Sequence, residues 1–188
     1  MEETKPETGT EQDQTVTEVP KTRTFSAQTI HLLRTAQMNT LTLSQMADQK
    51  ASILIGATFV VFSLAVTRLL GAEISWSTLS LAATAFLSSL CAVLAVLPSL
   101  GKPPTDPDAF NLLFFGHFAA ISEEQWTDEL LDEFATDETL FRTILKDIHQ
   151  NGQVLYRRKY RYLTYAYRIF LTGLLITWVI YAAEYFWG

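Results

Sequence analysis

Three long apolar segments, separated by polar stretches, form the strongest pattern in the chain. They cover residues 51–70, 74–97 and 167–187. A helix needs about 20 apolar residues to cross the roughly 30 Å of hydrocarbon in a bilayer, and each segment is about that long. The third is apolar over a shorter stretch, but aromatic residues extend it on both sides, as is usual where a span meets lipid headgroups. The pattern predicts three transmembrane helices.

More polar segments predict helices outside the membrane, over residues 26–50 and 104–166. Neither Gly nor Pro occurs between Ser26 and Ile55, so the first of these helices is expected to continue into the first span. After the break "LPSLGKPPTDPD" we expect a helix over "PDAFNLLFFGHFAAIS" that lies against its neighbours or the headgroups. The next helix begins with a capping box formed by Ser122 and Gln125.

That next helix, over residues 123–134, is expected to bury Trp126, Leu130 and Phe134. A last helix begins near Asp137 and runs into the third span. Its predicted stripe at helical spacing is Phe141, Leu145, Ile148, Gly152, Leu155 and Tyr162. The expected fold class is all-α: an integral membrane protein with three transmembrane helices and a small cytosolic helical bundle continuous with them.

The distribution of positive charge predicts the orientation. Of the 14 Lys and Arg residues, only Arg68 lies near the far side of the spans; the others precede the first span or lie between the second and the third. Because cytoplasmic loops carry the excess of Lys and Arg, we expect a multi-pass protein with a cytoplasmic N-terminus and the C-terminus outside. Residues 1–24 are polar and acidic and predict a disordered cytosolic tail.

Composition excludes several kinds of site. The net charge of −6 argues against a DNA or RNA partner. A single cysteine, Cys91, excludes disulfides and cysteine-based zinc motifs, and the three histidines have no metal-ligand spacing. The chain has no Gly-x-Ser-x-Gly, His-Glu-x-x-His or phosphate-binding glycine loop. We therefore expect no catalytic residue, no metal and no cofactor.

Polar residues that directly precede the first predicted span in the sequence form the first candidate site. By helical spacing Asn39 and Lys50 share one face, whereas Asp48 points the opposite way, so Asp48 and Lys50 are not partners of each other. An acid near anionic headgroups needs a cation, and we expect Asp48 to pair with one from the cluster Arg157, Arg158, Lys159 and Arg161. Such a pair is either a structural clamp or a gate that moves when a ligand binds.

The cation cluster itself has two interpretations. "LYRRKYRYLTYAYR" interleaves cations with tyrosines, which suits an anionic ligand such as a nucleotide phosphate with a stacked base. It equally suits the positively charged, aromatic edge of a membrane span. His117 in "FFGHF" is interpreted as a packed, hydrogen-bonded histidine or, alternatively, as a functional group.

Three segments of the chain resemble the transmembrane-type effectors of Pycsar, a bacterial anti-phage system. They are "HLLRTAQMNTLTLSQMADQKASILIGATFVV", "NLLFFGHFAAIS" and "LKDIHQNGQVLYRRKYRYLTYAYRIFLTGLL", and the resemblance covers about residues 28–180 of the domain 25–188. It is carried by the order of Asn39, Asp48-x-Lys50-Ala51, the Phe-Phe-Gly-His-Phe run, Asp147-Ile148 and Lys159-Tyr160 relative to the spans.

The resemblance implies a role that the spans alone do not. In that family a partner cyclase makes cyclic UMP or cyclic CMP, and the effector senses the nucleotide and impairs the integrity of the bacterial inner membrane, which causes abortive infection. The ligand-binding or gating candidates are Asn39, Asp48, Lys50, His117, Arg157, Arg158, Lys159 and Arg161. Three spans cannot line a wide pore, so a homo-oligomer is expected, with contacts through the small residues of "SLAATAFLSSLCA". The alternatives are a membrane-anchored scaffold and a small pore subunit that needs no ligand.

Overall fold

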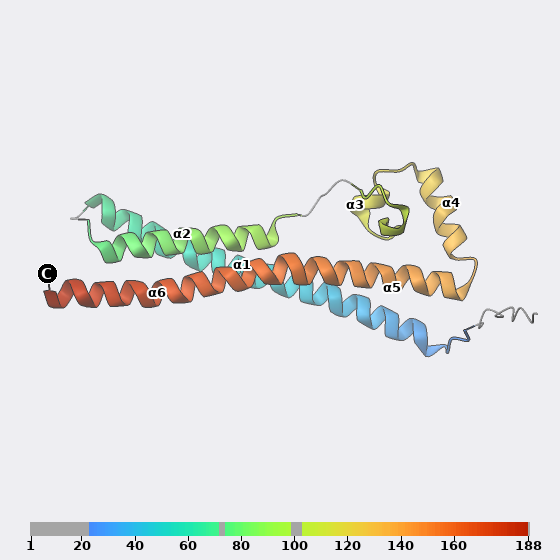
Figure 1. Cartoon of the computed structure of the whole chain (residues 1–188), viewed down its shortest axis with the longest axis horizontal. Helices are drawn as coiled ribbons and strands as arrows, with labels where there is room; N and C mark the ends of the chain where they lie inside the picture. Colours follow the sequence, from blue (N-terminus) through green and yellow to red (C-terminus); the bar gives the residue numbers. More distant parts are fainter. Residues whose placement is uncertain (1–22, 72–73, 99–102, 188) are drawn as a thin grey trace, which may run out of the picture.

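The computed structural model describes residues 23–71, 74–98 and 103–187. The predicted tail, residues 1–24, lies almost entirely outside the described residues. Within these ranges every regular element is a helix, so the all-α fold class is confirmed. Figure 1 shows an elongated molecule in which α1, α2 and α6 lie together towards one end, while α3 and α4 lie beside α5 towards the other.

Two very long helices organise the chain. Helix α1 spans Gln28–Gly71 without a break, which confirms that the polar helix predicted before residue 51 and the first apolar segment are one element. Helix α5 (Asp137–Val154), a π-helical turn (Leu155–Tyr160) and α6 (Arg161–Trp187) form the second. Helix α2 spans Trp76–Val96. Among the described residues, three helices are long and apolar enough to cross a membrane, as the sequence predicted.

Small residues hold the three long helices together. Ala85, Ser88 and Ala92 on α2 have no exposed surface, and the Ser88 hydroxyl donates to the backbone oxygen of Ala166 on α6 at 2.8 Å. Close approach between helix backbones requires such residues. The stripe in "SLAATAFLSSLCA" that was expected to join copies of the chain therefore packs against helices of its own chain.

Large apolar side chains face outward instead. Phe59, Leu175 and Trp178 are 66%, 67% and 68% exposed. A bundle with small residues inside and bulky apolar residues outside suits surroundings of lipid better than water, because contiguous exposed apolar surface is unfavourable in water.

A carboxylate joins two helices at the end of the bundle near the C-terminus. Glu184 on α6 accepts hydrogen bonds from the Ser75 hydroxyl at 2.8 Å and from the backbone N–H groups of Trp76 and Ser77 at 2.7 and 3.3 Å. These N–H groups belong to the first turn of α2, where a negative charge is favourable.

The segment between α2 and α5 differs from the prediction. Instead of one helix over residues 107–122, it contains a 3₁₀ turn (Pro107–Ala109), irregular chain and a single turn α3 (Phe115–Phe118). The Asn111 side chain accepts from the backbone N–H of Leu113 at 2.9 Å, and this local bond competes with helix formation.

Helix α4 (Glu123–Glu133) and α5 begin where expected. Ser122 accepts from the backbone N–H of Gln125, and Thr136 does the same for Thr139, both at 3.2 Å. Trp126 is half-buried, but Phe134 is 48% exposed, so the prediction that it is buried was wrong. The indole N–H of Trp126 donates to the Leu112 oxygen at 2.9 Å, which ties α4 to the irregular segment.

Candidate functional site

An ion pair joins α1 to the π-helical turn at the boundary of the apolar half of α1. The Lys159 ammonium lies 2.8 and 2.6 Å from the two carboxylate oxygens of Asp48 and donates to the Ser44 hydroxyl at 2.8 Å. The side chain of Lys159 is 24% exposed and that of Asp48 is 44% exposed. Asp48 and Ser44 are one helical turn apart, so a single face of α1 supplies both acceptors.

The π-helical turn is the second feature of this region. Residues 155–160 contain Leu155, which is buried, and the cations Arg157, Arg158 and Lys159. A π turn inserts an extra residue into an α-helix and is frequently found at functional sites. Here it places neighbouring cations so that Lys159 meets Asp48 while both arginines border hollows on the surface.

His117 fixes the irregular segment opposite α5. Its Nδ1 accepts the backbone N–H of Asn111 at 3.0 Å, so that nitrogen carries no proton. The ring packs edge-on to Phe114 at 5.0 Å between ring centres. Burial lowers the pKa of His117 from its ordinary value of 6.5, and the positive charge of Lys146 lowers it further. The interpretation of His117 as a packed, hydrogen-bonded residue fits this geometry.

A buried polar network connects this segment to α5. The Asn111 amide donates to the Asp147 carboxylate at 3.1 Å, and the Asn151 amide donates to the same oxygen at 2.8 Å. The side-chain amide of Gln150 donates a hydrogen bond to the backbone oxygen of Ala109 at 3.1 Å. Hydrogen bonds to a buried carboxylate are costly to lose, so the irregular segment and α5 keep a fixed separation.

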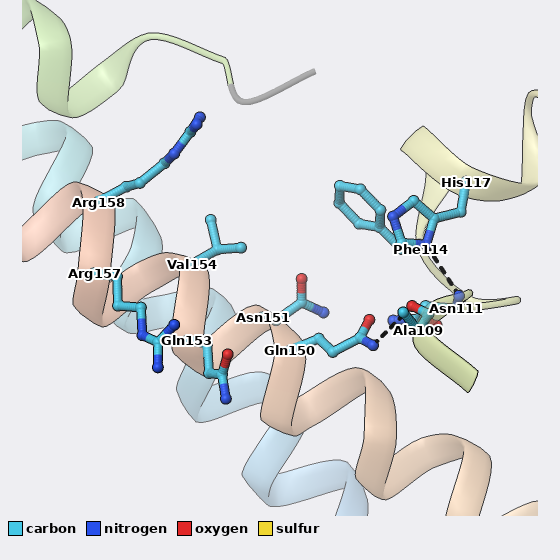
Figure 2. Close-up of a pocket in the computed structure, with 10 residues that line it drawn as sticks. All are labelled: Ala109, Asn111, Phe114, His117, Gln150, Asn151, Gln153, Val154, Arg157 and Arg158. Atoms are coloured by element: carbon cyan, nitrogen blue, oxygen red, sulfur yellow. Dashed lines mark hydrogen bonds between the residues drawn. The ribbon is translucent and has the colours of Figure 1, made fainter. Parts of the chain in front are cut away.

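Between these elements lies an open cavity of about 380 Å³. Figure 2 shows α5 and the π turn along one side and the segment of Asn111, Phe114 and His117 on the other. The lining combines two aromatic rings, four amides and two guanidinium groups: Phe114, His117, Asn111, Gln150, Asn151, Gln153, Arg157 and Arg158, with Ala109 and Val154. The volume lies within the usual range of small-ligand sites, about 300–1,000 Å³.

This lining suits a small anion that carries a flat ring. Arginines bind phosphate oxygens through charged hydrogen bonds, aromatic rings stack on bases, and amides can both donate to and accept from the edge of a base. Figure 2 shows Arg157 and Arg158 leaving the helix in different directions. In the part of the chain that the structure describes, no group of His, Cys, Asp and Glu side chains is arranged to hold a metal ion.

The structure divides the predicted site residues among several places. His117, Arg157 and Arg158 border the cavity, while Asp48 and Lys159 form the ion pair beside it, so the predicted pairing of Asp48 with the cation cluster is found. Arg161 lies over the ring of Tyr165, 5.9 Å from its centre, in a second hollow that Arg157 and Arg158 also border.

Two other candidates lie apart from the cavity. Asn39 and Lys50 are exposed on α1, and neither side chain has a hydrogen bond or ion pair within residues 23–71, 74–98 and 103–187. The sequence reasoning missed the amides Asn111, Gln150 and Asn151. Asp147 and Asn151 are one helical turn apart, which was a usable signal, but the position of Asn111 depends on a contact between distant parts of the chain.

A comparison with protein families identifies the relationship. The family model described as PycTM, the Pycsar effector protein domain, matches residues 31–184. The chain belongs to the Pycsar effector family. No curated protein and no solved structure matches it.

The match covers α1, α2, the irregular segment and the continuous helix from α5 to α6, so the ion pair and the cavity both lie inside the Pycsar effector domain. Membership makes this chain a downstream effector in anti-phage defence, and it implies a partner system that produces cyclic nucleotides. The effector family is not a known class of enzyme.

Proposed function

We propose that this protein is the membrane effector of a cyclic-pyrimidine-nucleotide defence system: it binds cyclic UMP or cyclic CMP and then impairs the inner membrane, which causes abortive infection. The observation that carries the proposal is the cavity beside the π turn, because it unites phosphate-binding, stacking and base-edge groups in a Pycsar effector.

Binding is argued from the chemistry of the lining. The single negative charge of a cyclic nucleotide phosphate is attracted by Arg157 or Arg158, and its base stacks near Phe114 and the neutral ring of His117. The amides of Gln150 and Gln153 are available for the edge of the base. The polar edge of the bundle is thereby the sensor of the nucleotide.

Coupling to the membrane follows from the neighbourhood of the cavity. Arg157 and Arg158 directly precede Lys159, which holds Asp48. A phosphate bound by Arg157 or Arg158 also attracts the adjacent Lys159, which weakens the pairing of Lys159 with Asp48 and changes the packing of α6 on α1. Only a difference in affinity between the two packings moves the equilibrium, and a few kcal/mol is enough for a bundle that is nearly balanced.

Dye release from proteoliposomes tests the proposal. We expect release on addition of cyclic UMP or cyclic CMP, and none with cyclic AMP or with linear UMP. Replacing both arginines (Arg157→Gln with Arg158→Gln) should raise the nucleotide concentration needed for half-maximal release about tenfold or more, because charged hydrogen bonds to phosphate contribute roughly 1.5–3 kcal/mol each. The two single variants then show which guanidinium group carries the effect.

Arg142→Gln is the matched control. Arg142 lies on α5, pairs with Glu138 at 2.6 Å and does not border the cavity, so its replacement removes the same charge without touching the site. Release that occurs equally without nucleotide, or that responds to Arg142→Gln as strongly as to the cavity variants, contradicts the proposal.

A further inference from the structure

One face of the first half of α1 is mostly apolar and largely exposed within the described residues. Its members follow one another at alternating spacings of four and three residues: Leu32, Ala36, Asn39, Leu43 and Met46. Leu32 is 70%, Leu43 45% and Met46 42% exposed. We call these five residues the α1 seam. An alternation of four and three is the spacing by which parallel helices pack in a left-handed coiled coil.

The seam is distinct from the face that α1 uses inside its own chain. That inner face contains Leu33, Ala47 and Ala51, which are all buried. The seam lies beside it along the helix. The π turn reaches it at the backbone oxygen of Leu43, which accepts from the Tyr160 hydroxyl at 3.4 Å, so the outward side chains of the seam stay open to a second helix. Lipid would cover the exposed leucines in the apolar half of α1, but the seam precedes that half. Its apolar side chains are therefore covered only if another protein packs against them.

The same spacing continues into the apolar half of the helix. Beyond Lys50 it passes through Ile53, Ala57, Val60 and Leu64, which are all exposed. Copies of one chain insert into a membrane with one orientation, so their α1 helices are parallel and close in register before they touch. Confinement in the bilayer raises their effective concentration, and this compensates for a seam of only two heptads.

Polar residues in and beside the seam favour a second copy of the same helix. In a parallel pair Asn39 faces Asn39, and an amide satisfies its twin by donating and accepting one hydrogen bond. The flanking positions Thr35, Thr40 and Thr42 carry no charge, so two copies approach without repulsion. Lys50 occupies the next position of the repeat. Two lysines facing each other repel, so close contact between the two helices is limited to the residues before Lys50.

From this self-complementary spacing we propose that the α1 seam is a docking surface for a second copy of this chain, which pairs two effectors in parallel through residues 32–46. The pairing is present with or without nucleotide. It brings two ion pairs and two cavities into one assembly.

Disulfide cross-linking in native membranes tests the seam. In a Cys91→Ala background, Leu43→Cys or Met46→Cys is oxidised and the product is run without reductant. We expect covalent dimers from both variants within minutes, since a disulfide needs Cβ atoms about 3.5–4.5 Å apart. Leu41→Cys is the matched control: Leu41 is 56% exposed, more than Leu43, but lies on another face of the same turn. It should form at least tenfold less dimer.

A second variant separates docking from random collision. Leu32→Glu with Asn39→Glu places like charges along the seam and should abolish the Leu43→Cys cross-link, while the unfolding temperature of the detergent-solubilised chain stays within a few degrees of the parent. Equal cross-linking at Leu41 and Leu43 overturns the proposal. The proposal is also overturned if the Leu43→Cys protein is folded but stays monomeric, and if anionic vesicles shield its introduced thiol from a thiol reagent. Lipid and not a second copy would then cover the seam. No cyclic nucleotide is added, so the result is independent of the proposed function.

Discussion

At the scale of single residues, His117 combines a structural and a chemical role. Its unprotonated Nδ1 holds the Asn111 backbone, and its ring borders the cavity. Protonation would put a proton on the nitrogen that now accepts a hydrogen bond and would add a charge near Lys146. The fold therefore favours the neutral imidazole.

This predicts a pH dependence of stability. Because the pKa of His117 is lower in the folded protein than its ordinary value of 6.5, the unfolded chain binds more protons between these two pKa values. The contribution of His117 is fully present above pH 6.5 and is lost as the pH falls through the folded-state pKa. Thermal unfolding in detergent from about pH 8 to pH 5 should show this loss in the parent protein and a shallower slope in His117→Gln.

His149→Gln is the control for that measurement. His149 is exposed on α5 and bonds only Gln153, at 2.8 Å, among the hydrogen bonds of the described chain. The same slope in the parent protein and in His117→Gln would show that another group governs the dependence.

The Asp48–Lys159 pair gives a second prediction at this scale. Since Asp48 is 44% exposed, losing the pair should cost less than about 1 kcal/mol of the free energy of unfolding. Its effect on gating should be larger. Asp48→Lys should either abolish dye release or cause release without nucleotide. Adding Lys159→Asp should restore release that depends on the nucleotide. Lys50→Ala, two residues away and without a described side-chain partner, should change nothing. Release unaffected by Asp48→Lys would show that the pair is not part of the gate.

At the scale of elements, the π turn explains why one prediction from sequence failed. A continuous α-helix would put Leu155 and Tyr162 on the same stripe, yet Tyr162 is 37% exposed and Leu163 is 5% exposed. The π turn inserts one residue and moves the stripe by one position. Apolar periodicity cannot detect this, because either register places an apolar residue inside.

One glycine marks a point of close approach between α2 and α6. A Cβ added to Gly173 would overlap the side chain of Thr84, so the two helices meet where neither has room for another atom. Gly173→Ala should therefore lower the free energy of unfolding by about 1–3 kcal/mol, and Thr84→Ala in the same chain should recover most of it. Chemical or thermal unfolding in detergent measures both effects.

Gly56 on α1 provides the control for this test. A Cβ there would meet nothing within 4 Å. Gly56→Ala should keep or raise stability by up to about 1 kcal/mol, as expected for alanine inside a helix. Equal losses at Gly56 and Gly173 would show that the α2–α6 contact is not the cause.

At the scale of the whole molecule, sequence predicted the architecture better than the site. Runs of about 20 apolar residues predicted three long helices, and these were confirmed, since span length depends on local composition alone. The cavity could not be predicted in the same way, because Asn111 is held at its edge by a hydrogen bond to Asp147, 36 positions away in the sequence. The motif pattern singled out His117, and the run of cations singled out Arg157 and Arg158, but neither pointed to the amides that line the cavity with them.

Orientation remains a prediction that labelling can test. In a Cys91→Ala background, Ser26→Cys should react with a membrane-impermeant maleimide only after cells are opened, and Trp187→Cys should react in intact cells. The reason is the concentration of Lys and Arg on the side that includes α5 and the π turn. Labelling of both positions in intact cells, or of neither, contradicts the three-span arrangement.

The carboxylate of Glu184 has a mechanical consequence. It fastens α6 to the start of α2 by three hydrogen bonds, whereas at the opposite end the π turn meets α1 through the Asp48–Lys159 ion pair and a buried cluster that includes Ala47 and Leu155. A displacement of the π turn that leaves the Glu184 hydrogen bonds intact would therefore tilt α6 about its C-terminal end. Such a tilt would move α6 most beside the π turn and least at Glu184, so the bundle would open first at the end that carries the cavity.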